Sequence, residues 1–258
     1  MAIAFVQSGQ ATHVSNNATL SVGLVATTVG DDILFFVSPE SGGGVTSVTD
    51  NGAGGGNTYT FLTSLTNGTV QLEVWLSHNT TVSTTSVTAH FSPQCPSEGI
   101  CAEYSGVSAI GGHTTNIGSD TNPTISLNLQ DASNWLVTGF DAVMASPSYT
   151  QQTGTLRTTS SAGLNNNAAL VDNGPTSGST TCSVTYAVAS NWAGAAVELR
   201  SATTVEVDQP SDAVLRGKTT KLQRTPGPGQ FLGDNVDFTP PPGPGGGVGG
   251  SVRRTKWR

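Results

Sequence analysis

Histidine and serine, which often act as bases and nucleophiles, occur in this chain without the spacing that such chemistry needs. His13, His78, His90 and His113 form no H-x-H or H-x-x-x-H pair, so we predict surface or loop histidines rather than metal ligands. The segment Gly106-Val107-Ser108-Ala109-Ile110 begins like a nucleophile elbow but lacks the final glycine. No helix is expected after it. Nucleophilic catalysis is therefore not predicted.

Carboxylates are the second candidates for chemistry, because a glycosidase needs two of them about 5–9 Å apart. The most suggestive strand, Glu73 to His78, holds a single acid, and Glu103 stands alone between Ala102 and Tyr104. Pairing of acids across different strands stays open at this point. We predict that the chain is not an enzyme.

Sites for metal ions and phosphates are not predicted either. The glycine-rich segment Gly52–Asn57 lacks the lysine and the following helix of a P-loop, and we expect a hairpin tip. Asp31-Asp32 and Asp50-Asn51 offer oxygen ligands for Ca²⁺, but they do not match an EF-hand, and side-chain-stabilised turns are the preferred interpretation. No cofactor and no metal ion is expected.

The aromatic side chains suggest a platform on which sugar rings could stack. Because aromatics make up only 6% of the chain, we expect most of them in the core. The residues concerned are Trp75, Trp135, Trp192, Tyr59, Tyr104 and Tyr149.

The three cysteines are predicted to be structural. Cys182 alternates with Val184 and Tyr186 on an apolar face, which indicates a buried free thiol. Cys95 and Cys101 bracket a short loop. They are a possible disulfide after release into an oxidising medium, whereas two thiols are expected in a cytoplasm.

Alternating apolar residues predict that strands position these side chains. Val70 to Leu76 alternates apolar with polar side chains, so one face should be dry and the other wet. The continuous run Ile33–Val37 indicates a central strand covered on both faces. We expect roughly 12–14 strands, among them the separate segments 125–129 and 133–144, linked by Gly/Asn/Ser loops and without helical spacers. Residues 1–200 are thus predicted to form an all-β, two-sheet β-sandwich, jelly-roll-like in type.

The charges divide the chain into two parts. Residues 1–199 hold 12 acids and one base, a net charge of −11, whereas residues 200–258 hold nine bases and five acids, a net charge of +4. The first part cannot grip a phosphate backbone, and we expect it to have an acidic, lysine-poor exterior. The N-terminus lacks the pattern of a signal peptide, and no stretch approaches the ~20 apolar residues of a membrane span.

Residues 201–258 are predicted to form an extended arm. Between residues 226 and 250, 15 of 25 residues are Pro or Gly, so this linker cannot bury enough surface to fold alone. Phe231 and Phe238 are apolar positions within it. Residues 251–258 form a basic end with the composition of a protein anchor. Its expected binding residues are Arg253, Arg254, Lys256, Trp257 and Arg258.

Four segments resemble a β-sandwich module of tailed-bacteriophage structural proteins and uncharacterised bacterial proteins. They are Ile3–Gln7, Asn57–Thr60, Ala102–Val107 and Asn191–Val197. The resemblance covers residues 1–200, rests on structural motifs and implies a jelly-roll-like fold without transferable chemistry. Sandwich modules with a trailing arm are similar to capsid decoration (cement) proteins or minor tail proteins. In those proteins the body sits on the virion surface and the arm threads between subunits.

This resemblance and the arm together predict a virion structural protein, preferably a capsid decoration or cement protein made in the host cytoplasm. Its expected partners are the major capsid protein or other virion subunits, and it should form a homo-oligomer, either a dimer or a trimer. No membrane contact is expected. Three alternatives are a carbohydrate-binding adhesion module of a tail or fibre, nucleic-acid contact through the basic end alone, and, last, a secreted hydrolase. Head and tail locations both stay open.

Overall fold

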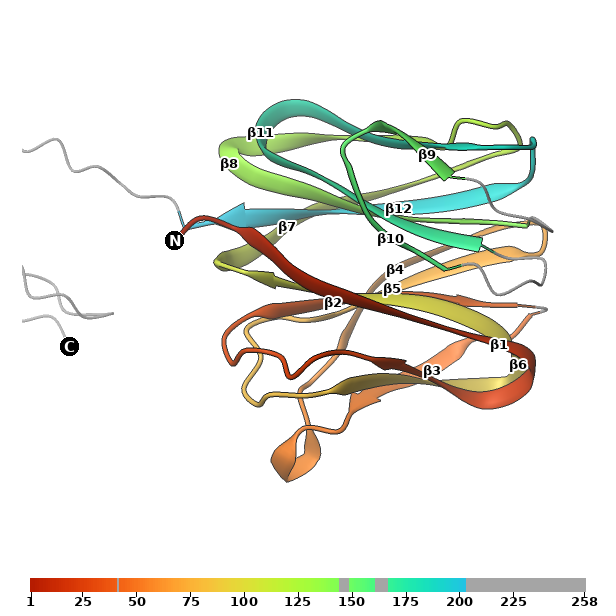
Figure 1. Ribbon diagram of the computed structural model, residues 1–258, viewed down its shortest axis with the longest axis horizontal. Coiled ribbons are helices and arrows are strands. Elements are labelled where there is room, and N and C mark those ends of the chain that lie inside the picture. The colour runs from red at the N-terminus through yellow and green to blue at the C-terminus, as the bar shows by residue number, and fades with distance from the viewer. Residues whose placement is uncertain (41, 144–148, 161–166, 203–258) are drawn as a thin grey trace, which may run out of the picture. The chain divides into compact units, whose positions relative to one another are not determined.

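The computed structural model describes residues 1–40, 42–143, 149–160 and 167–202 (Figure 1). The chain divides into two units, Met1–Thr204 and Val205–Arg258, and every described residue belongs to the first. Alternating apolar and hydroxyl side chains favour extended backbone, and the described part contains twelve strands and no α-helix. A short 3-10 turn, Ala53–Gly55, interrupts them.

The strands form two antiparallel six-stranded sheets. Sheet A has the order β1-β6-β2-β5-β4, with β3 also paired to β6. Its strands are β1 Ala4–Gly23, β2 Asp32–Pro39, β3 Val45–Asp50, β4 Thr60–Asn67, β5 Val70–Ser77 and β6 Ser86–Ser105. Sheet B has the order β10-β11-β8-β12-β7, with β9 also paired to β11. Its strands are β7 Val107–Gly118, β8 Thr124–Ala142, β9 Tyr149–Thr153, β10 Thr155–Thr159, β11 Asn167–Tyr186 and β12 Trp192–Ser201.

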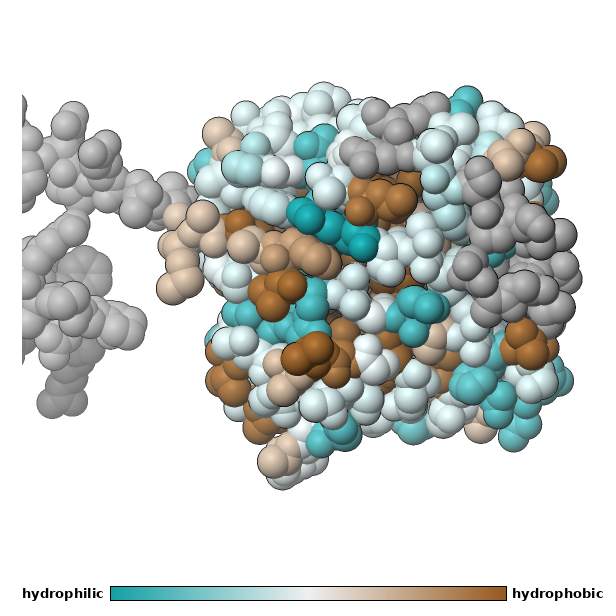
Figure 2. Space-filling model, viewed as in Figure 1, coloured by the Kyte–Doolittle hydropathy of each residue, from teal (hydrophilic) through white to brown (hydrophobic). Residues whose placement is uncertain are grey.

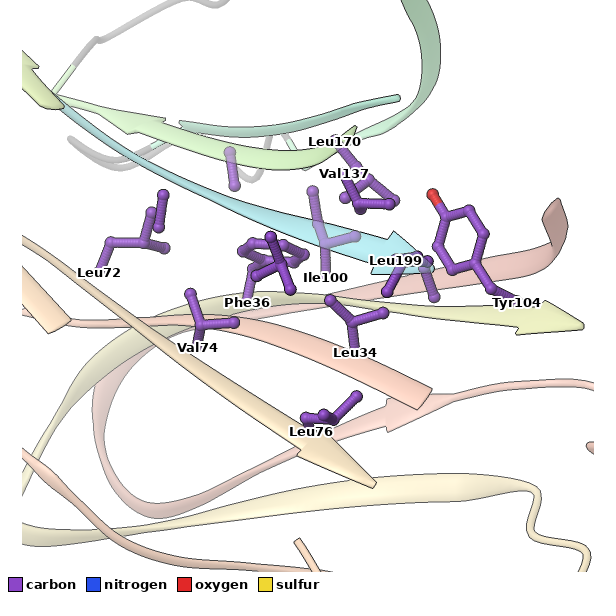
Figure 3. Packing of buried hydrophobic residues seen from close by; sticks show 14 of the residues in the cluster. Leu34, Phe36, Leu72, Val74, Leu76, Ile100, Tyr104, Val137, Leu170 and Leu199 are labelled. Carbon is purple, nitrogen blue, oxygen red and sulfur yellow. The ribbon is translucent and has the colours of Figure 1, made fainter. Parts of the chain in front are cut away.

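The two sheets pack face to face, which confirms the predicted all-β sandwich (Figure 1). Their apolar inner faces form the central core, where Figure 3 shows Phe36 and Ile100 of sheet A close to Val137 of sheet B. As predicted, β2 is a central strand, and all of its residues are buried. Such an arrangement removes large aliphatic side chains from water on both sides of one strand.

Each sheet also curls back over its own outer face. The long strands β1 and β6 pair in two stretches separated by register shifts between His13 and Thr19, and β8 and β11 are similarly interrupted between Asn173 and Gly178. Such irregularities bend a strand and increase its twist. The far halves of these pairs then cover two further apolar clusters, one on the outer face of each sheet.

The two curled pairs are built on the same plan. In sheet A, β2 pairs with the second half of β6 and β3 with its first half. In sheet B, β9 pairs with the second half of β11 and β10 with its first half. Pro93 lies in the bend of β6 and Pro175 in the bend of β11. The outer layer of sheet A therefore contains β3 beside the first half of β6, and that of sheet B contains β9 beside the second half of β11.

Two expectations about individual strands need correction. The segments 125–129 and 133–144 were predicted as separate strands, but they join in the single bent strand β8. The supposedly wet face of β5 is largely covered, because Glu73 is buried and Trp75 is half-buried. The curled layer of sheet A packs over this face, which sequence alternation alone does not reveal.

Gly139 on β8 leaves room for the Phe36 ring of the opposite sheet, because a Cβ atom at this position would lie 2.6 Å from Cγ of that ring. We therefore expect Gly139→Ala to destabilise the protein by about 1–3 kcal/mol through overpacking. Thermal denaturation of the full chain measures this loss. Gly23→Ala is the control, because its Cβ would have no atom within 4 Å. Equal melting temperatures for the two variants would contradict the argument.

Candidate functional site

The acidic side chains lie mostly inside the sandwich rather than on its surface. Eight of the twelve carboxylates in residues 1–199 are buried: Asp31, Asp32, Glu73, Glu98, Glu103, Asp141, Asp172 and Glu198. Four acids remain outside this set, so the exterior is less acidic than the net charge of −11 suggested. Buried carboxylates require donors, protons or cations, so they mark the places where the fold carries unusual chemistry.

One acid pair bridges the two sheets. Glu98 on β6 and Asp141 on β8 are both buried, and burial raises the pKa of each carboxyl. The Ser38 hydroxyl donates a hydrogen bond to Asp141. The Tyr149 and Tyr186 rings stack edge to face nearby, with centroids 5.2 Å apart. Polar groups thus gather at one place between two otherwise apolar layers.

A second group of acids lies where β2 begins. Burial raises the pKa of Asp31 to about 6, and the neighbouring carboxylates of Glu103 and Asp32 add to the rise. Glu103 accepts hydrogen bonds from the side chain of Gln7 and from the backbone N–H of Thr28. The pairing across strands that the sequence left open is thus found here, between Asp31 and Glu103.

Asp32 and His78 form a dyad beside this group. The Nδ1 atom of His78 lies 2.8 Å from a carboxylate oxygen of Asp32, and the His78 side chain is 39% exposed. Such an arrangement orients an imidazole so that its other nitrogen faces away from the carboxylate. Among the described residues, however, no hydroxyl or thiol hydrogen-bonds to the ring of His78. The geometry supports an oriented histidine without a partner nucleophile.

Arg157 contacts residues of both sheets at one side of the sandwich. Its guanidinium lies over the Phe5 ring at 4.5 Å and pairs with Asp172 at 2.8 Å. The Tyr104 hydroxyl donates to the same carboxylate, and the Trp135 ring completes the surround. Burial raises the pKa of Asp172, while the bonds from Arg157 and Tyr104 oppose this rise. The cluster ties β1 and β6 of sheet A to β8, β10 and β11 of sheet B.

Arg200 likewise forms an ion pair with a buried carboxylate, that of Glu198. Although burial opposes its charge, hydrogen bonds from Gln130, Asn134, Gly112 and Arg200 lower the pKa of the Glu198 carboxyl. These bonds join strands β7, β8 and β12. Both arginines among the described residues therefore form ion pairs with buried carboxylates.

The aromatic residues singled out in the sequence do not form one exposed face. Tyr104 and Trp192 are buried, and Trp135 belongs to the Arg157 cluster. Trp75 is half-buried and meets the exposed Phe61 edge to face at 5.4 Å. The preferred interpretation of these side chains as core residues fits this arrangement.

Turn and thiol predictions can also be compared with the structure. Asp50 accepts hydrogen bonds from the backbone of Gly52 and from the Asn57 and Tyr59 side chains, so the predicted stabilised turn is confirmed. Cys182 is a buried free thiol, as predicted, and burial raises its pKa to about 12. Cys95 and Cys101 are free and buried as well.

The predicted anchor residues of the arm lie outside the described residues, as does the linker 226–250. The anchor residues are Arg253, Arg254, Lys256, Trp257, Arg258, Phe231 and Phe238.

No protein-family model matches the chain, and no curated protein or solved structure matches it. Among the described residues, no three or more His, Cys, Asp or Glu side chains are grouped so that they could hold a metal ion. The same part of the chain has no helix long and apolar enough to cross a membrane. The polar groups described above are therefore interpreted from their own contacts.

Sequence reasoning missed the acid pairs because their members are far apart in the chain. Glu98 and Asp141 come from different sheets, and Asp31 lies 72 positions before Glu103. A weak signal was present: acids stand within otherwise apolar strand segments, as at Glu98 to Ala102. Such positions indicate buried carboxylates, but they do not reveal the partner.

The Arg157–Asp172 pair provides a test of how buried charge is balanced. Arg157→Met keeps an apolar stem against Phe5 but leaves Asp172 buried without a cation, and we expect a loss of about 3 kcal/mol at neutral pH. The loss should shrink as the pH falls toward about 4, because Asp172 then becomes protonated. Chemical denaturation at several pH values measures it. Adding Asp172→Asn should restore most of the stability, and a deficit independent of pH would contradict this account.

Asp31 provides a direct titration test. We expect its carboxyl to titrate with a midpoint of about 6, measured by NMR of the side-chain carboxyl carbon. Its proton stabilises the fold, so this contribution should be lost as the pH rises from about 4 to about 6. Glu103→Gln should lower the midpoint, because a neighbouring carboxylate is removed. A wild-type midpoint near that of a free aspartate would refute the pairing.

Proposed function

We propose that the chain is a virion structural protein, specifically a phage capsid decoration (cement) protein anchored through its C-terminal arm. The observation that carries the proposal is the distribution of positive charge. Arg157 and Arg200 are both held by buried carboxylates within the body. The other eight lysines and arginines lie beyond residue 202. The arm therefore supplies the basic side chains for pairing with acidic groups of neighbouring subunits.

The body has the properties of a passive structural module. Three apolar clusters lie between and outside its sheets, and the polar groups in its interior are mostly tied to one another. Figure 2 shows a face covered mainly by weakly polar side chains, with small separate apolar groups. Such a surface suits a module that stays soluble while another segment makes the specific contacts.

The arm has a composition suited to binding an assembled lattice. Its Pro/Gly-rich linker is followed by a basic end containing Trp257. Arginine forms bidentate pairs with carboxylates, and a tryptophan can fill a pocket on a partner. Attachment to a repeating lattice, or to a sister copy in a dimer or trimer, repays the cost of ordering such a segment through many contacts. The acidic partner surface would belong to the major capsid protein or another virion subunit.

The carbohydrate-binding alternative has less support. Tyr104 and Trp192 are buried, and the edge-to-face pair of Phe61 and Trp75 does not offer two parallel ring faces. Nucleic-acid contact is reserved for the basic end, since the body has no unpaired arginine among its described residues.

The anchoring role can be tested by truncation. We expect removal of residues 240–258 to leave the melting temperature of the body unchanged and to abolish incorporation into particles. Occupancy is measured by adding purified protein to particles that lack it and analysing the sedimented material. Two matched variants separate the contributions of charge and ring: Trp257→Ala, and glutamine at all of Arg253, Arg254, Lys256 and Arg258. Normal occupancy of the truncated protein would refute the proposal.

A further inference from the structure

Two carboxyl groups from opposite sheets meet inside the sandwich. Glu98 is 3% exposed and Asp141 is fully buried. Glu98 projects from β6 of sheet A and Asp141 from β8 of sheet B. Ser38 lies opposite Glu98 in the β2–β6 register and hydrogen-bonds to Asp141, so the two carboxyl groups are neighbours, and each affects the pKa of the other. Two carboxylates only accept hydrogen bonds, so a bond between them requires a proton on one of them.

Three carboxyl oxygens of this pair have no donor among the described residues, and one proton held between the two groups pairs two of them. Asp141 accepts a bond from the Ser38 hydroxyl on Oδ2, but its Oδ1 atom has no donor among the described residues. When Glu98 is treated as a carboxylate, both of its oxygens also lack a donor in that part of the chain. A proton on Glu98 supplies the missing donor to Oδ1 of Asp141. Buried polar atoms are otherwise almost always paired, so the gap is informative.

No positive side chain of the described body neutralises the pair. Arg157 and Arg200 are bound to other carboxylates. The remaining titratable groups that face the pair are Glu40, Tyr149 and Tyr186, which are acidic or neutral. The Tyr149 and Tyr186 hydroxyls are buried and have no partner in the described residues. None of these titratable neighbours offers a positive charge, so they favour a protonated pair over two charges.

The surroundings also decide which carboxyl holds the proton. The Ser38 hydroxyl, whose one proton lies between the Gln71 carbonyl and Asp141, and the nearby backbone N–H groups of Ala142 and Asn167 all favour the ionised form of Asp141. Glu98 has only the Ser160 hydroxyl beside it. Burial and the charge of Asp141 accordingly raise the pKa of Glu98 well above its ordinary range. Glu98 is the acid of the pair and Asp141 its carboxylate acceptor.

We propose that Glu98 and Asp141 share one proton and form a pH-sensitive clamp between the two sheets. The closed clamp is the hydrogen bond from the Glu98 O–H to Asp141. In alkaline solution the proton passes from Glu98 to solvent, and two adjacent carboxylates remain. Their repulsion, without a nearby cation, then separates β6 from β8 at this end of the sandwich.

The direction of the pH effect follows from proton linkage. The folded state holds a proton that the unfolded chain has already released at neutral pH. The stabilisation is therefore complete below the ordinary pKa of a glutamate and is lost as the pH rises toward the raised pKa of Glu98. The clamp closes toward acidic pH and opens toward alkaline pH.

Replacement of each acid by its amide tests the assignment in the full-length protein. Glu98→Gln keeps a donor toward Asp141 and cannot ionise, so its melting temperature at pH 8 should exceed that of wild type by on the order of 5 °C. The difference should vanish near pH 4. Asp141→Asn leaves one acceptor oxygen and turns the other into an NH2 donor, so the side chain can no longer accept from both Ser38 and Glu98, and the melting temperature should fall at both pH values. At pH 8 the clamp therefore predicts a raised melting temperature for Glu98→Gln and a lowered melting temperature for Asp141→Asn.

A spectroscopic readout separates the clamp from a merely structural effect. The infrared band of a protonated carboxylic acid should be present in wild type at pH 8 and absent from Glu98→Gln. Glu198→Gln is the matched control, because the Glu198 carboxyl is fully supplied with donors and has a lowered pKa. It should destabilise the protein and leave the band unchanged.

Three results would overturn the proposal. One is the absence of the protonated band at pH 8, and another is a Glu98→Gln variant less stable than wild type at pH 8. The third is stability at pH 8 that rises with added Ca²⁺ in wild type but not in Glu98→Gln, since a cation rather than a proton would then join the two carboxylates.

Discussion

Two arginines must serve a domain that holds twelve carboxylates, and most features of its interior follow from this shortage. Each arginine is committed to one buried acid, Arg157 to Asp172 and Arg200 to Glu198. Other buried acids must be satisfied by neutral donors. Glu73 accepts bonds from a backbone N–H, an amide and an indole N–H, and none of these carries a charge. Where such donors run out, a shared proton is the remaining solution, because an isolated buried charge is too costly.

The curled sheets explain why some of these acids are buried on the outer faces, whereas Glu98 and Asp141 lie between the sheets. An ordinary sandwich leaves the outer face of each sheet in water, where a carboxylate needs no partner. Here the far halves of β1 and β6 cover the outer face of sheet A, and those of β8 and β11 cover sheet B. Glu73 and Glu103 on the outer side of sheet A are thereby removed from solvent. The curled layers that bury apolar side chains thus also bury carboxylates, which then need hydrogen-bond donors from within the protein.

The sequence predicted local features better than partnerships. Alternation identified the strands and the central position of Ile33–Val37, because these depend on neighbours within one segment. The turn at Asp50 was predictable for the same reason, since its donors lie within nine positions. The pairing of Glu98 with Asp141 depends on how two sheets are placed in space, and no local spacing encodes it. Likewise, the prediction of a solvent-exposed face on β5 was wrong, because the strands that cover this face come from elsewhere in the chain.

The scarcity of surface charge on the body has a consequence for how the molecule responds to its medium. Dissolved salt weakens interactions between exposed charges but has little effect on pairs held in an interior, with a screening length of about 8 Å at physiological ionic strength. The arginine pairs of the body are partly or fully enclosed, and four carboxylates remain outside the buried set. The other eight lysines and arginines lie beyond residue 202 in the sequence. On the proposed anchoring role, ionic strength should weaken binding through the arm while having little effect on the fold of the body.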